Sequence, residues 1–340
     1  MVSTKVKSRG AVLITVMIVV FIIVAIITHL TVTNYRTVKR LSNRQLQEQA
    51  STIAFSTIDF GRAGLGTSAA TLATDSLKDI WAQPLPKTKL FDEVYMSGYV
   101  IDEQGKFNLN DLINTNGRPN QTVINQFSNL LSYINLPPSL AYNIAYYMAS
   151  PQYQSDIMIQ YTTANPPSRP AGRPLLDMSE LILIKGVNSQ IINKLGQYVT
   201  IIPVNNYNYK NESQSESSPY KNGDKTQDGQ GLAINVNTAS PEVIAAKGGF
   251  SLSIAQRIVS TRQAKTFGST GEVTSFLTEN GVVKNDKDNK LNLSGLVVSS
   301  KYFTTHAVVE DQGDTVKWVA LVYRPNRSGQ WPQILWLHPE

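Results

Sequence analysis

The chain has 340 residues, of which 41% are hydrophobic and 16% charged, and its formal net charge is +6. It has no cysteine and only three widely spaced histidines, which excludes disulfides and thiolate metal sites and argues against a histidine-based zinc or catalytic centre. Lys5, Lys7 and Arg9 account for half of the net charge, so the other residues carry only +3 and a nucleic-acid partner is not expected. The length suggests about two domains.

The first predicted element is a membrane-spanning helix. Residues 11–30 are almost entirely apolar, and as a helix they would span about 30 Å, the thickness of a hydrocarbon core. A secretory signal has a shorter apolar region, about 7–15 residues, and a small-residue cleavage site after it, which this chain lacks. The charge pattern gives a simple anchor no clear orientation, because basic residues also follow the span, at Arg36, Lys39, Arg40 and Arg44.

A short basic leader that ends in glycine and precedes such a helix resembles the precursors of type IV pilins. The resemblance implies that a prepilin peptidase cleaves between Gly10 and Ala11 on the cytoplasmic side and that the apolar helix is retained. Small, flexible Gly10 suits an enzyme that takes the chain in extended form beside the membrane. The mature chain would begin with Ala11, where most pilins have an N-methylated phenylalanine.

Position five of the mature chain is then Thr15. Most pilins and pseudopilins have glutamate there, and its carboxylate pairs with the amino terminus of the subunit above. A carboxylate in lipid costs about 3 kcal/mol on insertion scales, and a subunit at the top of a filament has no amine above it to neutralise. A β-branched residue also simply suits a membrane helix, so Thr15 alone indicates little.

We predict that the same helix continues to residue 60 and becomes amphipathic. It contains no proline or glycine up to that point, and the glycine-rich residues 61–66 are predicted to end it. The apolar face of its second half recurs at helical spacing, at Leu46, Ala50, Ile53 and Ala54.

The next residues predict a mixture of helix and strand. We expect a further helical stretch over 69–86 and then a strand with a hairpin around Glu103–Lys106. From Pro119 to Leu277 the pattern is mostly helical, with breaks at prolines 137, 138 and 151 and a helix cap at Asp177 or Ser179. The last part alternates like a sheet, with turns at Asp311–Asp314 and Asn326–Gly329.

These elements predict an α+β fold with a pilin-like long N-terminal helix, an antiparallel sheet and an inserted all-α domain of the helix-hairpin-helix (SAM-like) type. The predicted parts are a leader (1–10), a transmembrane and amphipathic helix (11–60), the first part of the head (61–118), the inserted helical domain (119–285) and the C-terminal sheet (286–340).

The insert contains two units that resemble the helix-hairpin-helix of competence-type DNA-binding proteins. In those proteins a Gly-x-Gly hairpin directs backbone N–H groups at a phosphate. Here Gly249 and Phe250 are followed by Ser251, and Gly186 is followed by Val187 and Asn188, so both hairpins lack the second glycine. We therefore interpret them as packing modules. A membrane-anchored DNA receptor remains an alternative, and salt-dependent binding of duplex DNA would support it.

Three further motifs, with Gly10 and Thr15, resemble the GspK family of minor pseudopilins of the type II secretion system. They are a "GKFNLN-x-L" stretch (Gly105–Leu112), an "RPL…SEL…KG" stretch (Arg173–Gly186) and an "NVNTA" stretch (Asn235–Ala239). The resemblance implies a single-pass inner-membrane protein with most of its chain in the periplasm. Such a protein caps and helps initiate a pseudopilus with I-type and J-type pseudopilins on an inner-membrane assembly platform. A type IV pilus tip pilin is the nearest alternative.

The resemblance also implies calcium in the helical domain of some members. Asp224 and Asp228, in the long polar loop 205–230, could provide hard oxygen ligands, and Asp286 and Asp288 are a second candidate pair. Neither pair has the spacing of an EF-hand, and ordinary polar loops explain both equally well. The sequence contains no P-loop, no G-x-S-x-G elbow and no H-E-x-x-H, so no enzyme activity is predicted.

Overall fold

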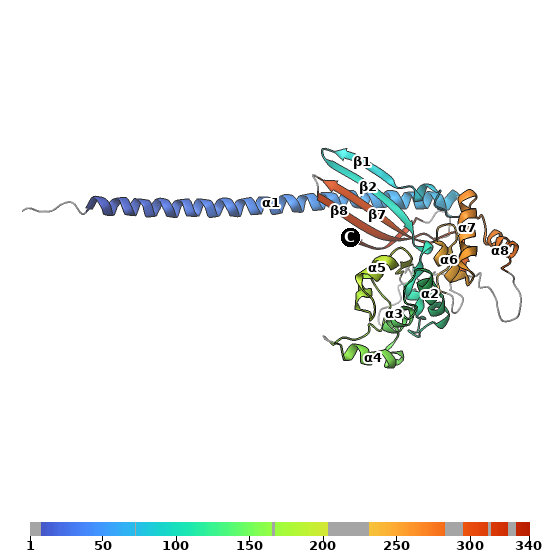
Figure 1. Cartoon of the computed structure of the whole chain (residues 1–340). Helices are drawn as coiled ribbons and strands as arrows, with labels where there is room; N and C mark the ends of the chain where they lie inside the picture. The colour runs from blue at the N-terminus through green and yellow to red at the C-terminus, as the bar shows by residue number, and fades with distance from the viewer. Residues whose placement is uncertain are drawn as a thin grey trace, which may run out of the picture.

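The computed structural model describes residues 8–71, 73–164, 167–202, 231–282, 295–311, 314–325 and 331–340. One long helix, α1 (Ser8–Thr71), projects far out of a head that contains a sheet and a set of short helices (Figure 1). At 1.5 Å per residue the 64 residues of α1 extend about 96 Å. The predicted fold class, a long helix with an antiparallel sheet and a helical insert, is confirmed. The insert was predicted to be all-α, but it also contains two pairs of short parallel strands, which join segments that are far apart in the sequence.

Helix α1 does not end at the glycines of residues 61–66, as the sequence predicted, but continues to Thr71. These glycines lie where the helix meets the sheet. A Cβ added at Gly61 would come within 2.6 Å of the Thr305 Cγ2 atom, and one at Gly66 within 3.3 Å of the Pro332 side chain. The glycines therefore permit close packing, and that packing offsets their low helix propensity, about 1 kcal/mol each relative to alanine.

The predicted helix over 69–86 is also wrong beyond Thr71. Among the residues described between 73 and 84, only Ile80–Ala82 are helical, as a 3₁₀ turn, η1, and the chain then enters strand β1. Trp81 in this turn is buried and packs edge-on against Phe303, with ring centroids 5.1 Å apart. The prolines at 84 and 86 and this buried indole explain why the segment leaves the helix.

The sheet is five-stranded and antiparallel, in the order β1-β2-β7-β8-β9. The second half of α1 lies across one face of it (Figure 1), where Ala50, Ala54, Ile58 and Leu65 are buried against the strands. The predicted hairpin at Asp311–Asp314 joins β7 to β8. The predicted turn at 326–329 lies outside the described residues. The strands are β1 (Leu85–Phe91), β2 (Val94–Asp102), β7 (Tyr302–Asp311), β8 (Asp314–Tyr323) and β9 (Gln333–Pro339).

The hairpin predicted around Glu103–Lys106 does not form. The turn instead joins β1 to β2 at residues 92–93, where Asp92 has a positive φ of 41°. After β2 the chain forms a 3₁₀ turn, η2 (Glu103–Gly105), and then strand β3 (Phe107–Asn108), which pairs in parallel with β4 (Val199–Thr200). The sequence indicated a strand and a turn here, but it did not show that the strand after the turn pairs with Val199–Thr200, about 90 residues farther along the chain.

The helices form what we call the helical body, residues 103–301, between β2 and β7. The predicted breaks at Pro137, Pro138 and Pro151 are confirmed, and the stretch capped by Asp177 is a 3₁₀ helix, η5 (Met178–Leu183). Its other elements are η3 (Leu109–Leu112), α2 (Gln121–Tyr133), α3 (Leu140–Met148), η4 (Pro151–Tyr153), α4 (Ser155–Thr162), α5 (Ser189–Leu195), β5 (Ile234–Asn235), α6 (Pro241–Gly248), α7 (Leu252–Ala264), α8 (Thr270–Glu279) and β6 (Leu296–Val297).

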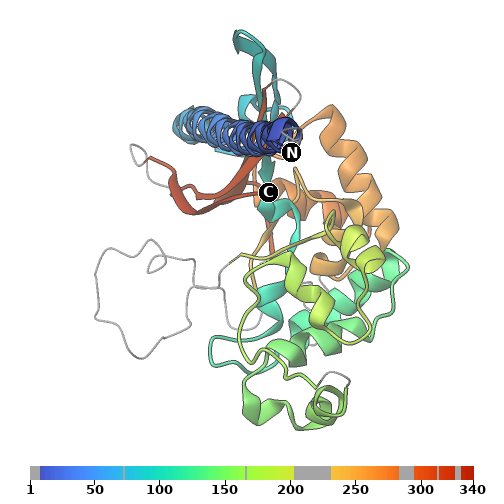
Figure 2. The same ribbon diagram turned by 90° about the vertical axis from the view of Figure 1, so that its left-hand side faces the viewer.

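The helical body is inserted between two strands that are direct neighbours, because Asp102 at the end of β2 pairs with Phe303 near the start of β7. It has its own buried core, which extends from Phe107 to Val298, whereas α1 and the sheet share another. Figure 2 shows it on one side of α1 and the sheet. The domain boundaries at 119 and 286 stay a prediction, but the extent of the core favours boundaries nearer to the ends of β2 and β7.

Candidate functional site: the exposed helix and the head joint

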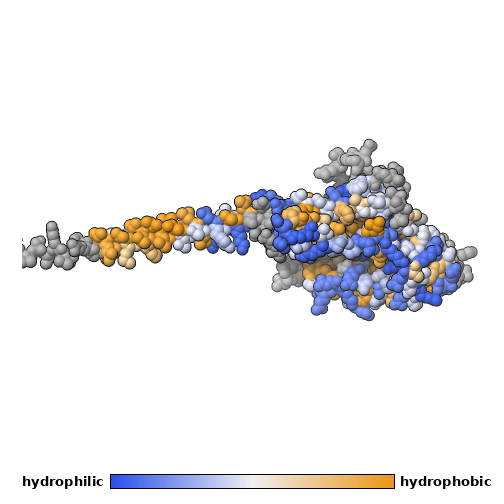
Figure 3. Space-filling view, turned by 90° about the horizontal axis from the view of Figure 1, so that it is seen from above, coloured by the Kyte–Doolittle hydropathy of each residue, from blue (hydrophilic) through white to orange (hydrophobic). Residues whose placement is uncertain are grey.

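The first half of α1 is an exposed apolar surface. Within the described residues it holds the one stretch long and apolar enough to cross a membrane, Val12–Leu41, which reaches a mean hydropathy of 3.0 with none of it buried. Figure 3 shows it as a continuous apolar surface on the outer part of the projecting helix, with hydrophilic residues nearer to the head. Apolar area of this extent requires lipid or other helices as its surroundings.

The threonine hydroxyls in this half are hydrogen-bonded to the helix itself. The Thr28 and Thr31 hydroxyls each donate a hydrogen bond of 2.8 Å to the carbonyl four residues earlier. The Thr15 Oγ1 donates to the Val12 carbonyl at 2.9 Å. Thr15 therefore fits lipid at little cost and provides no charge for a neighbouring amine. The structure places Gly10 and Ala11 in the first turns of α1, next to the apolar surface.

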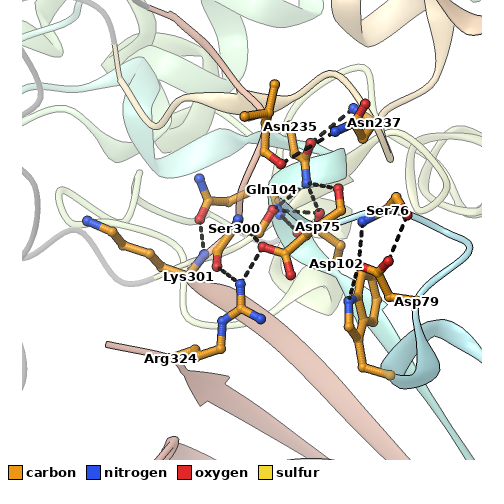
Figure 4. Close-up of polar contacts among 12 residues, drawn as sticks. Asp75, Ser76, Asp79, Asp102, Gln104, Asn235, Asn237, Ser300, Lys301 and Arg324 are labelled. Atoms are coloured by element: carbon orange, nitrogen blue, oxygen red, sulfur yellow. Dashed lines mark hydrogen bonds and ion pairs between the residues drawn. The ribbon is translucent and has the colours of Figure 1, made fainter. Parts of the chain in front are cut away.

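The second feature is a buried polar cluster, which we call the head joint, where α1, the sheet and the helical body meet (Figure 4). Its five members come from five separate parts of the chain: Asp75 follows α1, Asp102 ends β2, Asn235 lies in β5, Ser300 precedes β7 and Arg324 follows β8. All five are buried: Asp75, Asp102, Asn235, Ser300 and Arg324.

Asp102 is the centre of the head joint. Its Oδ2 atom accepts hydrogen bonds from Ser300 Oγ at 2.6 Å, Thr238 Oγ1 at 2.6 Å and Asn235 Nδ2 at 3.1 Å, and its Oδ1 accepts one from the Gln104 N–H at 2.8 Å. Burial raises the pKa of Asp102 to about 6, although these hydrogen bonds act in the opposite direction. The carboxylate thus connects the sheet to both ends of the helical body.

Asp75 and Arg324 form a buried ion pair beside it. The Arg324 guanidinium also donates to the Ser300 carbonyl at 2.7 Å and lies 4.8 Å from the centre of the Phe303 ring. The Ser300 N–H donates to Asp75 Oδ2 at 2.8 Å. These bonds fix the chain leaving α1 to the start of β7 and the end of β8.

The head joint explains the "NVNTA" motif. Asn235 Nδ2 also donates to the Asp75 carbonyl at 3.2 Å and contacts Ser300 Oγ at 2.9 Å, while its Oδ1 accepts the Asn237 N–H at 3.0 Å. Asn237 in turn is bonded through Oδ1 and Nδ2 to the backbone of Phe267. The sequence singled this motif out by resemblance, but its partners Asp75, Asp102 and Arg324 are distant in the sequence and no local spacing indicated them.

The "GKFNLN-x-L" motif holds the two ends of the segment 203–230 together. Asn108 Oδ1 accepts a hydrogen bond from the Ile202 N–H at 3.0 Å, and Asn110 Nδ2 donates one to the Ile202 carbonyl at 3.1 Å. Asp111 Oδ2 accepts the Leu232 N–H at 2.6 Å. Both ends of the predicted calcium loop are therefore fixed at one place, although Asp224 and Asp228, like Asp286 and Asp288, lie outside the described residues. The described residues contain no cluster of three or more potential metal ligands.

Both hairpins pack against apolar side chains of the helical body, and a Cβ at Gly186 would lie 3.2 Å from the Leu140 side chain. Phe250 is buried, and a Cβ at Gly248 would lie 2.2 Å from its ring. Ser251 occupies the N-cap of α7 in place of the second glycine. The Arg262 guanidinium is directed inward, to the Val236 and Ala239 carbonyls at 2.5 and 2.6 Å. This packing does not favour the DNA-receptor alternative.

The pKa of Asp102 gives a testable pH dependence. Its folded-state pKa of about 6 lies above the unfolded value of 3.8, so this group stabilises the fold fully below pH 4 and that contribution is lost as the pH rises through 6. A shift of about two units corresponds to about 3 kcal/mol. In Asp102→Asn the unfolding free energy, measured by urea titration from pH 3.5 to 8, should lack this fall. The control Asp59→Asn, which changes an exposed carboxylate, should keep it.

A long exposed apolar helix whose second half packs on an antiparallel sheet defines a pilin-like protein. Two family models, both described as type II secretion system protein K, match residues 105–204 and 234–294. The chain therefore belongs to the type II secretion protein K family and is a minor pseudopilin of that system. The matched ranges contain all three motifs described above, which disfavours the alternative of a type IV pilus tip pilin.

Two known proteins agree with this assignment. A type II secretion system protein K from Pseudomonas aeruginosa is 25% identical over 309 residues, which cover 87% of this chain and 82% of that protein. A chain in the crystal structure of the GspK-GspI-GspJ complex from enterotoxigenic Escherichia coli has the same fold, with a TM-score of 0.66 and 20% identity over 88% of this chain and 99% of that one.

Proposed function

We propose that this protein caps the type II secretion pseudopilus and helps initiate it, and so supports protein export across the outer membrane without being an enzyme. The observation that carries this proposal is the position of the helical body. Helices α7 and α8 lie at the end of α1 farthest from its apolar half and extend past it (Figure 1). In a filament of stacked α1 helices, a body there occupies the space of the next subunit.

Thr15 supports the same proposal. A subunit with nothing above it needs no carboxylate at mature position five, and the Thr15 hydroxyl is bonded within its own helix. The residues 11–30 would be held in the inner membrane, and the head would lie in the periplasm, where the other pseudopilins assemble on the inner-membrane platform.

We further propose I-type and J-type pseudopilins as its partners, since the solved relative is a complex of GspK with GspI and GspJ. Co-expression of the full chain with both partners, followed by affinity purification in detergent, tests this. A stable complex of all three is expected. Recovery of the chain alone, while the partners bind each other, would contradict the tip role.

Processing of the leader gives the next prediction. Gly10→Val should block cleavage by the prepilin peptidase because a β-branched side chain disfavours the close, extended approach at that position. Thr15→Glu should be cleaved normally, because it lies beyond the cut. Mass spectrometry of the amino terminus in membranes will show which residue is first and whether the Ala11 amine is methylated. A mature protein that keeps its first ten residues in cells with active peptidase would refute the cleavage site.

Calcium is the proposed cofactor of the segment 203–230, with Asp224 and Asp228 as ligands. The fixed ends of the segment at Ile202 and Leu232 support this proposal, because they reduce the entropy lost on closing a loop around an ion. We expect millimolar calcium to protect the segment from limited proteolysis and a chelator to remove the protection. The pair Asp224→Asn and Asp228→Asn should abolish the effect, whereas Asp286→Asn should not.

A further inference from the structure

Helix α1 carries a group of basic side chains between its apolar half and the head. We call Arg36, Lys39 and Arg40 the basic stripe; Arg44 follows one turn later, and all four are exposed. No acidic residue precedes Glu48 in the sequence. Positive charge at the outer end of a membrane span opposes the usual orientation rule, so its presence there requires an explanation. If the leader is removed after Gly10, no basic side chain remains on the inner side to balance it.

The basic stripe has a defined direction. Eighteen residues correspond to about five turns of an α-helix, so Arg36, Lys39 and Arg40 lie in line with Ala54, Thr57 and Ile58, which are buried against the sheet. The stripe therefore lies on the face of α1 that the sheet covers farther along. It therefore faces the space between the membrane and the side of the head that is nearest to the membrane.

The backbone of the stripe lies just beyond a lipid headgroup layer, within reach of it for long side chains. Arg36 lies about 9 Å beyond Leu30, the end of the apolar run, and Arg40 about 15 Å beyond it. The headgroup layer of one leaflet is about 5–8 Å thick. Side chains on a helix lean toward its N-terminus, which here is toward the membrane, so the long cationic side chains reach back to the phosphates.

Arg44 differs from the stripe and provides a matched control. It is about 21 Å beyond Leu30, and its guanidinium bonds Glu48 at 3.1 Å, one turn farther from the membrane. Its charge is thus directed away from the lipid.

We propose that the basic stripe binds the headgroups of anionic phospholipids in the outer leaflet of the membrane that α1 crosses. The binding holds the unassembled subunit upright, with the head raised above the surface. This proposal rests on the membrane span of α1 but not on the tip role.

The test uses the full chain in vesicles. Tyr35→Trp places a tryptophan beside the stripe, and the four native tryptophans lie in the head, at residues 81, 318, 331 and 336. Quenching by brominated phosphatidylglycerol relative to brominated phosphatidylcholine gives the relative binding constant of the two lipids at that site. We expect a preference of about fivefold or more for phosphatidylglycerol, lost in 0.5 M salt.

Replacing all three stripe residues by glutamine should reduce this preference to about one, and Arg44→Gln should leave it unchanged. Equal binding of the two lipids to the parent would overturn the proposal while leaving the membrane anchor intact. The same result, together with loss of I-type or J-type binding in the triple variant, would assign the stripe to an acidic protein surface instead. A chain that fails to float with the vesicles would overturn the membrane span itself.

Discussion

Arg324→Met should lower the unfolding free energy of the head by about 3–5 kcal/mol, the cost of leaving a buried carboxylate without its partner. Arg324 and Asp75 are only 6% and 1% exposed, so water cannot replace the lost guanidinium. The substitution also removes the bond to the Ser300 carbonyl, which fixes the start of β7. Urea unfolding of the full chain in detergent, followed by the fluorescence of the four tryptophans of the head, measures the change.

Two further variants separate the ion pair from simple loss of packing. Asp75→Asn combined with Arg324→Met should recover part of the loss, because no buried charge remains. Lys87→Met removes an ion pair to Glu310 in which the side chains are 51% and 39% exposed, and it should cost less than about 1 kcal/mol. If Arg324→Met and Lys87→Met lowered the unfolding free energy equally, the buried ion pair of the head joint would contribute no more to stability than an exposed one.

Deleting the helical body should convert this subunit from one that ends a filament into one that does not. Asp102 and Phe303 pair directly, so the helical body together with Tyr302, the first residue of β7, can be replaced by Asn-Gly, which favours the tight turn of a two-stranded hairpin. The core between α1 and the sheet uses none of the deleted residues. The shortened chain should therefore fold, be processed and enter the membrane.

The expected effect on assembly is large. With the helical body absent and Thr15→Glu added, a further subunit can stack above, so pseudopili made with overproduced major subunit should lengthen severalfold and export should fall. Electron microscopy of sheared filaments gives the lengths. The full-length Thr15→Glu variant is the matched control and should keep short filaments. Unchanged lengths in the deletion variant would mean that another subunit provides the cap.

The sequence predicted what depends on local periodicity. The apolar run and the spacing from Leu46 to Ala54 indicated α1, and the alternation before Asp311 indicated β7 and its hairpin. It failed where tertiary packing decides. From the sequence, Gly61 is expected to end the helix. In the structure the Thr305 side chain lies so close that only glycine fits at this helical position. The head joint was missed for the same reason, since Asp75, Asp102 and Arg324 are brought together only by the fold.

The insertion between β2 and β7 has a consequence for how the chain folds. Its two pairing strands are separated by about 200 residues, and closing a flexible loop of that length costs about 4–5 kcal/mol of chain entropy. The helical body has a core of its own, so its early folding would bring both strand ends together before they pair. Because synthesis runs from the amino end, β2 is made long before β7, and its unpaired edge is open to aggregation until β7 arrives. An early-folding helical body would thereby act as an internal template for the sheet and shorten the time during which the edge of β2 is open.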